Sequence, residues 1–229
     1  MNEIIFAIDT NNKVEEVKKS VNYFASETIM PVDGVGVVPP PYSMNYLSRL
    51  FDFNSTHKFC IELKTNLVCG LGYEIKRGTP KKIKDFLKRP NNIAQDTFIR
   101  LCKKLRIDYE IFGRYALEIV KLNGKLSFYH VPAKDVYVKQ KKNSIYVDKY
   151  LLQTGMGSMI EYEPYAYQNK PGRYLYVHDH YNPVSRFYGV PNYVSSIKAI
   201  VGNDTITNYI LNFFSNNARP DYFIVVTGT

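Results

Sequence analysis

A stretch almost free of charge, residues 190–218, constrains this chain more than any other feature. Its only charged residues are Lys198 and Asp204, whose charges cancel. Pro191 suits the first turn of a helix, because the N–H that proline lacks would have no partner there. Pro220 cannot continue a helix, so the helical pattern ends before it. The stretch therefore predicts a helix of about 25 residues, on the order of 37 Å long.

Apolar residues occur on more than one side of this predicted helix. A surface helix of a monomer carries one apolar stripe and a charged back. The pattern leaves two interpretations: a helix in the centre of the core, or a helix packed by its own domain and by a neighbouring subunit. The stripes are Val194, Ile197 and Val201, and Ile200, Ile206, Ile210 and Phe214. The candidates for a subunit interface are Val194, Ile197, Val201, Ile210 and Phe214.

The segment 187–228 resembles the signature of tailed-bacteriophage portal proteins, nearest to the PBSX-type prophage branch. In that family a Tyr-Gly-x-Pro turn precedes a long helix, which ends in an Asn-Gly-Ala-x-Pro-like motif before an apolar strand. Asn217 stands where Gly is common, although Asn also tolerates the left-handed conformation that ends helices. The resemblance covers most of the chain after about Pro39. The matching positions are Tyr188, Gly189, Pro191, Asn216, Asn217, Ala218 and Pro220.

This resemblance implies a structural role and no enzymatic activity or cofactor. Portal subunits form a dodecameric ring at one vertex of the capsid, through which the terminase motor drives double-stranded DNA, and the ring later joins head and tail. The implied partners are copies of the chain, double-stranded DNA, the terminase large subunit, the capsid and head–tail adaptor proteins. The implied locations are the virion and, during assembly, the host cytoplasm. Portals are longer, so we expect this sequence to be an N-terminal and central fragment.

The expected fold class is α+β and portal-like, with small mixed sheets, several helices and one long C-terminal helix followed by a strand. Residues 1–42 contain a proline-rich run and predict an arm or linker. The resemblance implies a wing-like α+β body over 43–132 and a clip-like α+β insertion over 133–187. The long helix and its strand then occupy 188–229.

Local patterns predict most of the remaining elements. Asn123-Gly124 between two alternating runs is a strong signal for a β-hairpin. A helix that begins at Ser55 and ends at Gly70 would carry Phe59, Cys60, Leu63 and Leu67 on one face. The predicted helices are 13–24, 55–69, 80–88 and 93–112. The predicted strands are 73–76, 115–121, 125–130, 136–138, 144–151, 174–178 and 222–226.

The charge distribution indicates a polyanionic neighbour. The formal net charge is +9, and basic residues cluster in 76–89, 100–106 and 134–149. Any one such cluster is also compatible with an ordinary solvated face. Contacts to DNA passing through a channel should be to phosphate and should be weak and salt dependent. The candidates to face DNA or the capsid are Lys81, Lys82, Lys84, Lys134, Lys139, Lys141 and Lys142.

Two other functions remain open on the sequence. Tyrosines interleaved with lysines, among them Tyr137 and Tyr146, could stack on bases in an unrelated single-stranded nucleic-acid-binding module. His178 and His180 would share one face of a strand and could bind the metal of a hydrolase, although no third ligand at matching spacing is present. The three cysteines fit no metal spacing, and no apolar run is long enough to span a membrane.

Overall fold

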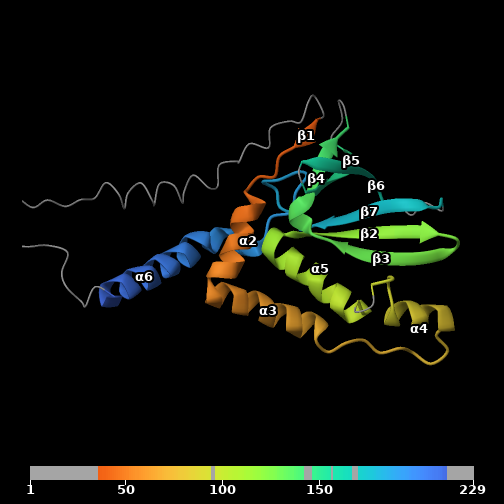
Figure 1. Ribbon diagram of the computed structural model, residues 1–229, viewed down its shortest axis with the longest axis horizontal. Coiled ribbons are helices and arrows are strands. Elements are labelled where there is room, and N and C mark those ends of the chain that lie inside the picture. The colour runs from red at the N-terminus through yellow and green to blue at the C-terminus, as the bar shows by residue number, and fades with distance from the viewer. Residues whose placement is uncertain (1–35, 94–95, 142–145, 156, 167–169, 216–229) are drawn as a thin grey trace, which may run out of the picture.

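The computed structural model describes residues 36–93, 96–141, 146–155, 157–166 and 170–215. Helices cover one face of a sheet, and one long helix extends away from the body (Figure 1). The expected α+β class and the long helix are therefore confirmed. The helices are α2 (Met44–Phe53), α3 (Ser55–Cys69), α4 (Lys81–Lys88), α5 (Phe98–Phe112) and α6 (Ile197–Ser215), with 3-10 turns η1 (Ala133–Asp135) and η2 (Asn192–Ser196).

The strands form one seven-stranded sheet, in the order β1-β4-β5-β6-β7-β2-β3. One half of the sheet contains antiparallel β4, β5 and β6, and the other half contains antiparallel β7, β2 and β3. A short parallel pairing of β6 with β7 joins the two halves. β7 pairs with β2 from Arg114↔Asp179 to Lys121↔Gly172. The expected boundary between residues 132 and 133 therefore falls inside this sheet. The strands are β1 (Val37–Val38), β2 (Arg114–Leu122), β3 (Lys125–Val131), β4 (Val136–Gln140), β5 (Val147–Thr154), β6 (Ser158–Pro164) and β7 (Gly172–Asp179).

The alternation of side chains along β2 places it between two apolar layers. Leu117 and Ile119 face α5 and pack with Leu101. Ala116 points to the other side, where it packs with Val136 of β4 and other residues of the second half of the sheet. Successive residues of a strand point to opposite faces, so one strand contributes to both layers.

Polar caps set the limits of the helices. The side chain of Asn54 accepts a hydrogen bond from the N–H of His57 and starts α3 directly after α2. α5 begins at Phe98, later than the expected residue 93, because Thr97 caps it by accepting from the N–H of Arg100. At its end Gly113 adopts a left-handed conformation, with φ of 70°.

Several local expectations are confirmed and others are wrong. The Asn123-Gly124 hairpin is present, with positive φ at both residues, as a tight two-residue turn requires. Residues 73–76 form no strand, whereas β6 forms over Ser158–Pro164, where the sequence predicts none. The expected helix 13–24, the strand 222–226, Lys142 and the motif residues Asn216, Asn217, Ala218 and Pro220 lie outside the described residues.

Candidate functional site

The Tyr188-Gly189 turn fixes the point where the C-terminal helix leaves the body. The hydroxyl of Tyr188 donates to the carbonyl of Val38 at 2.6 Å and accepts from the N–H of Val138 at 3.0 Å. It thereby joins this turn to both β1 and β4. The side chain is buried, and this burial raises the pKa of Tyr188 to about 12.

Gly189 is the second fixed point of this turn. A Cβ atom at this position would lie 1.9 Å from the carbonyl oxygen of Gly113 and 2.6 Å from the backbone N of His180. No side chain fits there, because the end of α5 and the turn touch through their backbones. The buried hydroxyl of Tyr42 closes the junction by donating to the carbonyl of Phe112 at 2.6 Å, and it also contacts the carbonyl of Gly189.

An ion pair between a buried arginine and a half-buried aspartate supports the same turn. The side chain of Arg114 is wholly buried, and its Nε lies 3.0 Å from Oδ1 of Asp179. The guanidinium also lies 4.6 Å from the centre of the Tyr188 ring. Oδ1 of Asp179 accepts a hydrogen bond from the N–H of Gly189 at 2.9 Å. Sequence reasoning missed Arg114 and Asp179, since no pattern in the chain marks two charges so far apart as partners.

The two histidines that flank Asp179 lie on the other side of β7. Nδ1 of His180 lies 2.7 Å from the hydroxyl of Tyr109, and the ring of His178 stacks on Tyr115. Among the described residues, no group of three or more His, Cys, Asp and Glu side chains could hold a metal ion. His178 and His180 therefore share one face, as expected, but that face is aromatic.

The root of α6 packs on its own domain. Ile197 is 2% exposed and belongs to the core cluster beneath α2, α3 and α5, with Val194 and Val201 half-buried against it. Asn54 donates to the carbonyl of Ile200 at 3.2 Å and ties this root to the start of α3. Ile197, one of the residues expected at a subunit interface, is thus buried by its own chain.

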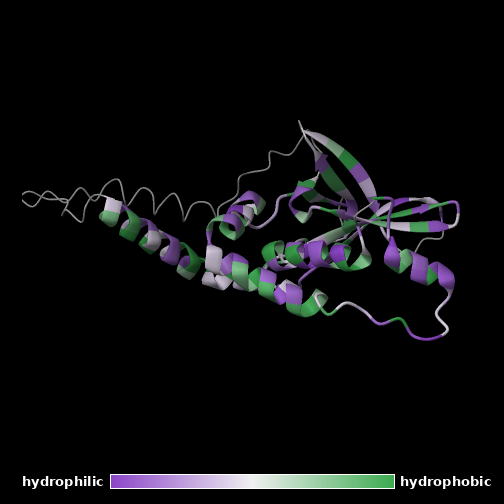
Figure 2. Ribbon diagram, turned by 60° about the horizontal axis from the view of Figure 1, so that its bottom comes forward, coloured by the Kyte–Doolittle hydropathy of each residue, from purple (hydrophilic) through white to green (hydrophobic). Residues whose placement is uncertain are grey.

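Beyond Asp204, α6 extends away from the body, and its apolar side chains are exposed. Ile210 is 45% and Phe214 is 68% exposed. Figure 2 shows hydrophobic residues along the projecting helix, on the left of the view. The two stripes expected from the sequence are thus both present, but only one has a partner within the described chain. The exposed apolar residues of this half are Ile206, Tyr209, Ile210, Leu211, Phe213 and Phe214.

α3 carries a second exposed apolar face. Its buried residues are His57, Ile61 and Thr65, which form a narrow stripe toward the body. The side chains expected on one face of this helix point to solvent instead. The exposed members of that face are Phe59, Cys60, Leu63 and Leu67, and Val68 extends the face at its edge.

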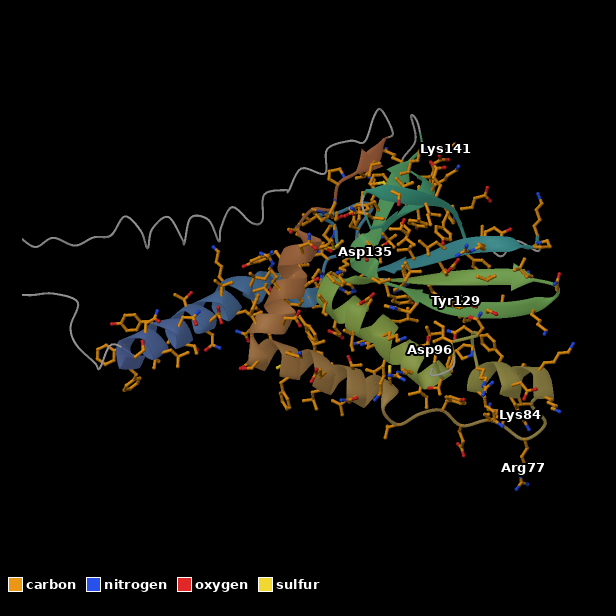
Figure 3. The ribbon with its side chains drawn as sticks, viewed as in Figure 1. Arg77, Lys84, Asp96, Tyr129, Asp135 and Lys141 are labelled. Atoms are coloured by element: carbon orange, nitrogen blue, oxygen red, sulfur yellow. The ribbon has the colours of Figure 1, made fainter. Side chains whose placement is uncertain are left out.

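The candidate basic residues lie on two separate surfaces. Lys81, Lys82 and Lys84 are exposed on α4, which packs through Phe86 against Phe128 of β3. Lys139 and Lys141 lie at the end of β4, at the opposite edge of the sheet, and Lys134 is exposed in η1. Figure 3 shows Arg77 and Lys84 far from Lys141.

One of these lysines has an acidic partner. Lys139 and Lys149 contact the two carboxylate oxygens of Glu161, at 2.8 and 2.6 Å. Their hydrogen bonds lower the pKa of Glu161 to about 2. The positive potential of the β4 surface is therefore partly neutralised, and α4 is the more strongly basic of the two surfaces. Tyr146, a candidate for base stacking, is 70% exposed.

No described helix combines the length and the apolar character that a membrane span requires. Comparison of the sequence with known protein families finds no match, and neither does comparison with curated proteins.

Solved structures provide matches. A chain in the neck of the empty gene transfer agent (GTA) particle, computed with C6 symmetry, matches with a TM-score of 0.68 and 18% identity over 83% of this chain and 51% of that chain. A chain of the native GTA virion gives 0.64 and 17%, over 80% and 48%. The native neck computed with C12 symmetry gives 0.59 and 18%, over 82% and 49%. The chain spans about half the length of these matches and shares their fold.

Proposed function

We propose that this chain is a structural component of a phage head–tail connection, and specifically the portal subunit that forms the ring-shaped DNA channel at the capsid vertex. The fold occurs in the neck and virion of gene transfer agents, which are phage-like particles. The Tyr-Gly turn of the portal resemblance occupies a position where neither residue can be replaced without loss of contacts.

The observation that carries this proposal is the exposed apolar half of α6. Exposed contiguous apolar surface on a soluble protein marks an interaction site. Ile206, Ile210, Leu211 and Phe214 remain 45–68% exposed to water in the described part of the chain. A ring of identical subunits supplies such a partner, because each copy meets a different surface of its neighbour.

DNA in such a ring contacts the chain through charge. Lys81, Lys82 and Lys84 on α4 are exposed and have a single acidic neighbour in the helix, Asp85. Sliding DNA requires contacts to phosphate and none to base edges, because tight binding would obstruct its passage. We further propose that the assembled ring meets the capsid, the terminase large subunit and head–tail adaptor proteins, first in the host cytoplasm and then in the virion.

Electron microscopy and mass measurement of the complete protein test this proposal. We expect closed dodecameric rings, which Ile210→Ser with Phe214→Ser would prevent while leaving the fold intact, because both side chains are exposed. Ile160→Ser on β6, with a comparable exposure of 44%, is the matched control and should leave the rings unchanged. A strictly monomeric complete protein would overturn the proposal.

DNA binding supplies a second test. Filter binding should report weak affinity that falls steeply as the salt concentration rises, since the contacts release counterions. Replacing the three lysines of α4 by Gln should weaken binding, whereas Tyr137→Ala with Tyr146→Ala should change it little. A large loss from the tyrosine variant would favour the alternative, a single-stranded nucleic-acid-binding module, because stacking on each base contributes about 1–3 kcal/mol.

A further inference from the structure

The outward face of α3 is more hydrophobic than its inward face, the reverse of a helix packed on a single domain. Phe59 and Ile61 are two residues apart and so lie about 200° apart around the helix. Ile61 is 3% exposed, whereas Phe59 is 64% exposed. The other two residues of the buried stripe, His57 and Thr65, are polar. The more hydrophobic of the two stripes of α3 therefore faces solvent.

α6 has the same property in its distal half. Ile197 and Ile206 are nine residues apart, or about two and a half turns, so they lie on opposite sides of the helix. Ile197 contacts the core, and Ile206 points away from it. The ring of Tyr209 stacks on Phe213, with their centres 6.5 Å apart, and widens this second stripe.

These two faces cannot cover each other within one chain. α3 runs toward α4, whereas α6 leaves the junction of α2 and α3 in the other direction, as both views show (Figures 1 and 2). The distal half of α6 therefore remains far from the outward face of α3 of the same copy. A second copy can bring the two faces together.

From these two faces we infer that the distal half of α6 of one copy packs on the outward face of α3 of the next copy. This inference rests on the proposed ring and names the pair of surfaces that builds it. A contact between two different surfaces is heterologous, and it closes into a ring when the rotation between copies allows.

The distribution of charge supports a second copy of the chain as the partner that covers the outward face of α3. Residues 205–215 of α6 contain no charged side chain. Two basic neighbours of the α3 face have partners within the chain, since Lys64 pairs with Glu110 at 3.2 Å and Lys103 donates to Asn66 at 3.0 Å, whereas Glu62 is exposed beside Phe59 and Leu63. An uncharged helix adds no second charge to this contact that would have to be buried without a partner.

The spacing of the side chains also matches. Phe59, Leu63 and Leu67 recur every four residues, as do Ile206, Ile210 and Phe214. Ridges with this spacing interdigitate when two helices cross at about −50°. The two helices therefore present the same kind of surface to each other.

The chain provides its own probe for this contact, the exposed Cys60 on α3. We would introduce Ile210→Cys, oxidise the assembled protein and separate the products by denaturing electrophoresis without reductant. Each copy then has one sulfur on each face, so the expected result is a ladder of dimers, trimers and longer species. Peptide mass mapping should identify position 60 joined to position 210.

Two control variants and the unaltered chain limit the interpretation. Ile210→Cys in a Cys60→Ala background should lose the ladder, and so should Ile160→Cys with Cys60 retained. A dimer that persists in the Cys60→Ala background, with position 210 joined to position 210 in the peptide map, would show that α6 pairs with α6 and would overturn the inference. Crosslinks between two copies of Cys60 in the unaltered chain would show pairing of α3 with α3, which also overturns it.

A second measurement separates this inference from the proposed function. Leu63→Ser should weaken self-association in sedimentation by at least roughly tenfold, because it removes one apolar side chain from the contact. Ile160→Ser, with an exposure close to the 46% of Leu63, should have no effect. Rings that form with neither the crosslink nor this dependence would overturn the pairing of α3 with α6 and leave the portal proposal standing. Absence of any assembly would overturn both.

Discussion

The two halves of α6 differ in almost every respect except composition. Ile197 in the first half is buried among residues of α2, α3 and α5, while Ile210 in the second half is largely exposed. The first half is held at the Tyr188-Gly189 turn and by Asn54. The second half contacts none of these elements, although it is also apolar and, unlike the first half with Lys198 and Asp204, has no charged residue.

This difference shows what separates a core helix from an interface helix. Both halves would read as buried in a hydropathy profile, because burial by a second copy and burial by the same chain select the same residue types. Only the position of the body decides which half is covered. Substitutions in the first half should therefore affect folding, and matched substitutions in the second half should affect assembly alone.

The largest expected effect is that of Gly189→Ala. The added Cβ would collide with the backbone of Gly113 and separate the turn from α5, which also breaks the 2.7 Å hydrogen bond from the N–H of His180 to the carbonyl of Gly113. We expect a loss of about 4 kcal/mol in the free energy of unfolding, measured by urea denaturation. Gly202→Ala in α6 meets no atom within 4 Å and should instead stabilise the chain by up to about 1 kcal/mol. Equal effects of the two variants would contradict the comparison.

The next effect is that of Ile197→Ala. Removing this buried side chain leaves a cavity beneath α2 and should lower the free energy of unfolding by about 3 kcal/mol. Ile210→Ala, the same change in the exposed half, should alter it by less than about 0.5 kcal/mol. Thermal unfolding of dilute protein, in which association is absent, measures both. A large effect of Ile210→Ala under these conditions would show that the distal half folds against its own chain.

A smaller effect is expected for Tyr188→Phe. The change removes the hydroxyl that contacts Val38 and Val138 and leaves the buried N–H of Val138 without that acceptor. We expect a loss of about 2 kcal/mol. Tyr181→Phe, whose side chain is 84% exposed, is the control and should be close to neutral in the same denaturation experiment.

Alkaline pH should also destabilise the Tyr188 turn, which holds the first half of α6. Burial raises the pKa of Tyr188 to about 12, above the value near 10 of an unfolded chain, because the folded protein disfavours the phenolate. The stability that depends on the neutral tyrosine is then fully present below about pH 10 and is lost as the pH rises toward 12. The slope of unfolding free energy against pH in this range should be shallower in Tyr188→Phe. An unchanged slope would show that Tyr188 does not titrate on unfolding.

The sequence by itself determined the elements whose signals are local. The Asn123-Gly124 turn, the start of α3 near Ser55 and the charge-poor run that becomes α6 all depend on neighbouring residues, and all lie close to where the sequence predicts them, although Asn54 and not Ser55 caps α3. The two apolar stripes of α6 also follow from its sequence, because side-chain direction repeats with the helical turn. The portal-like motif at Tyr188 and Gly189 was recognisable for the same reason.

Only the tertiary structure decided which stripe is covered and which charges meet. Arg114 and Asp179 are 65 positions apart in the chain and become neighbours because β2 pairs with β7. The face of α3 that contains Phe59 and Leu63 has the pattern of a core face, yet α5 packs on the other side of the helix. Periodicity specifies that a helix has an apolar face, but the direction of that face depends on contacts between segments distant in sequence, and those contacts are not encoded in any single stretch.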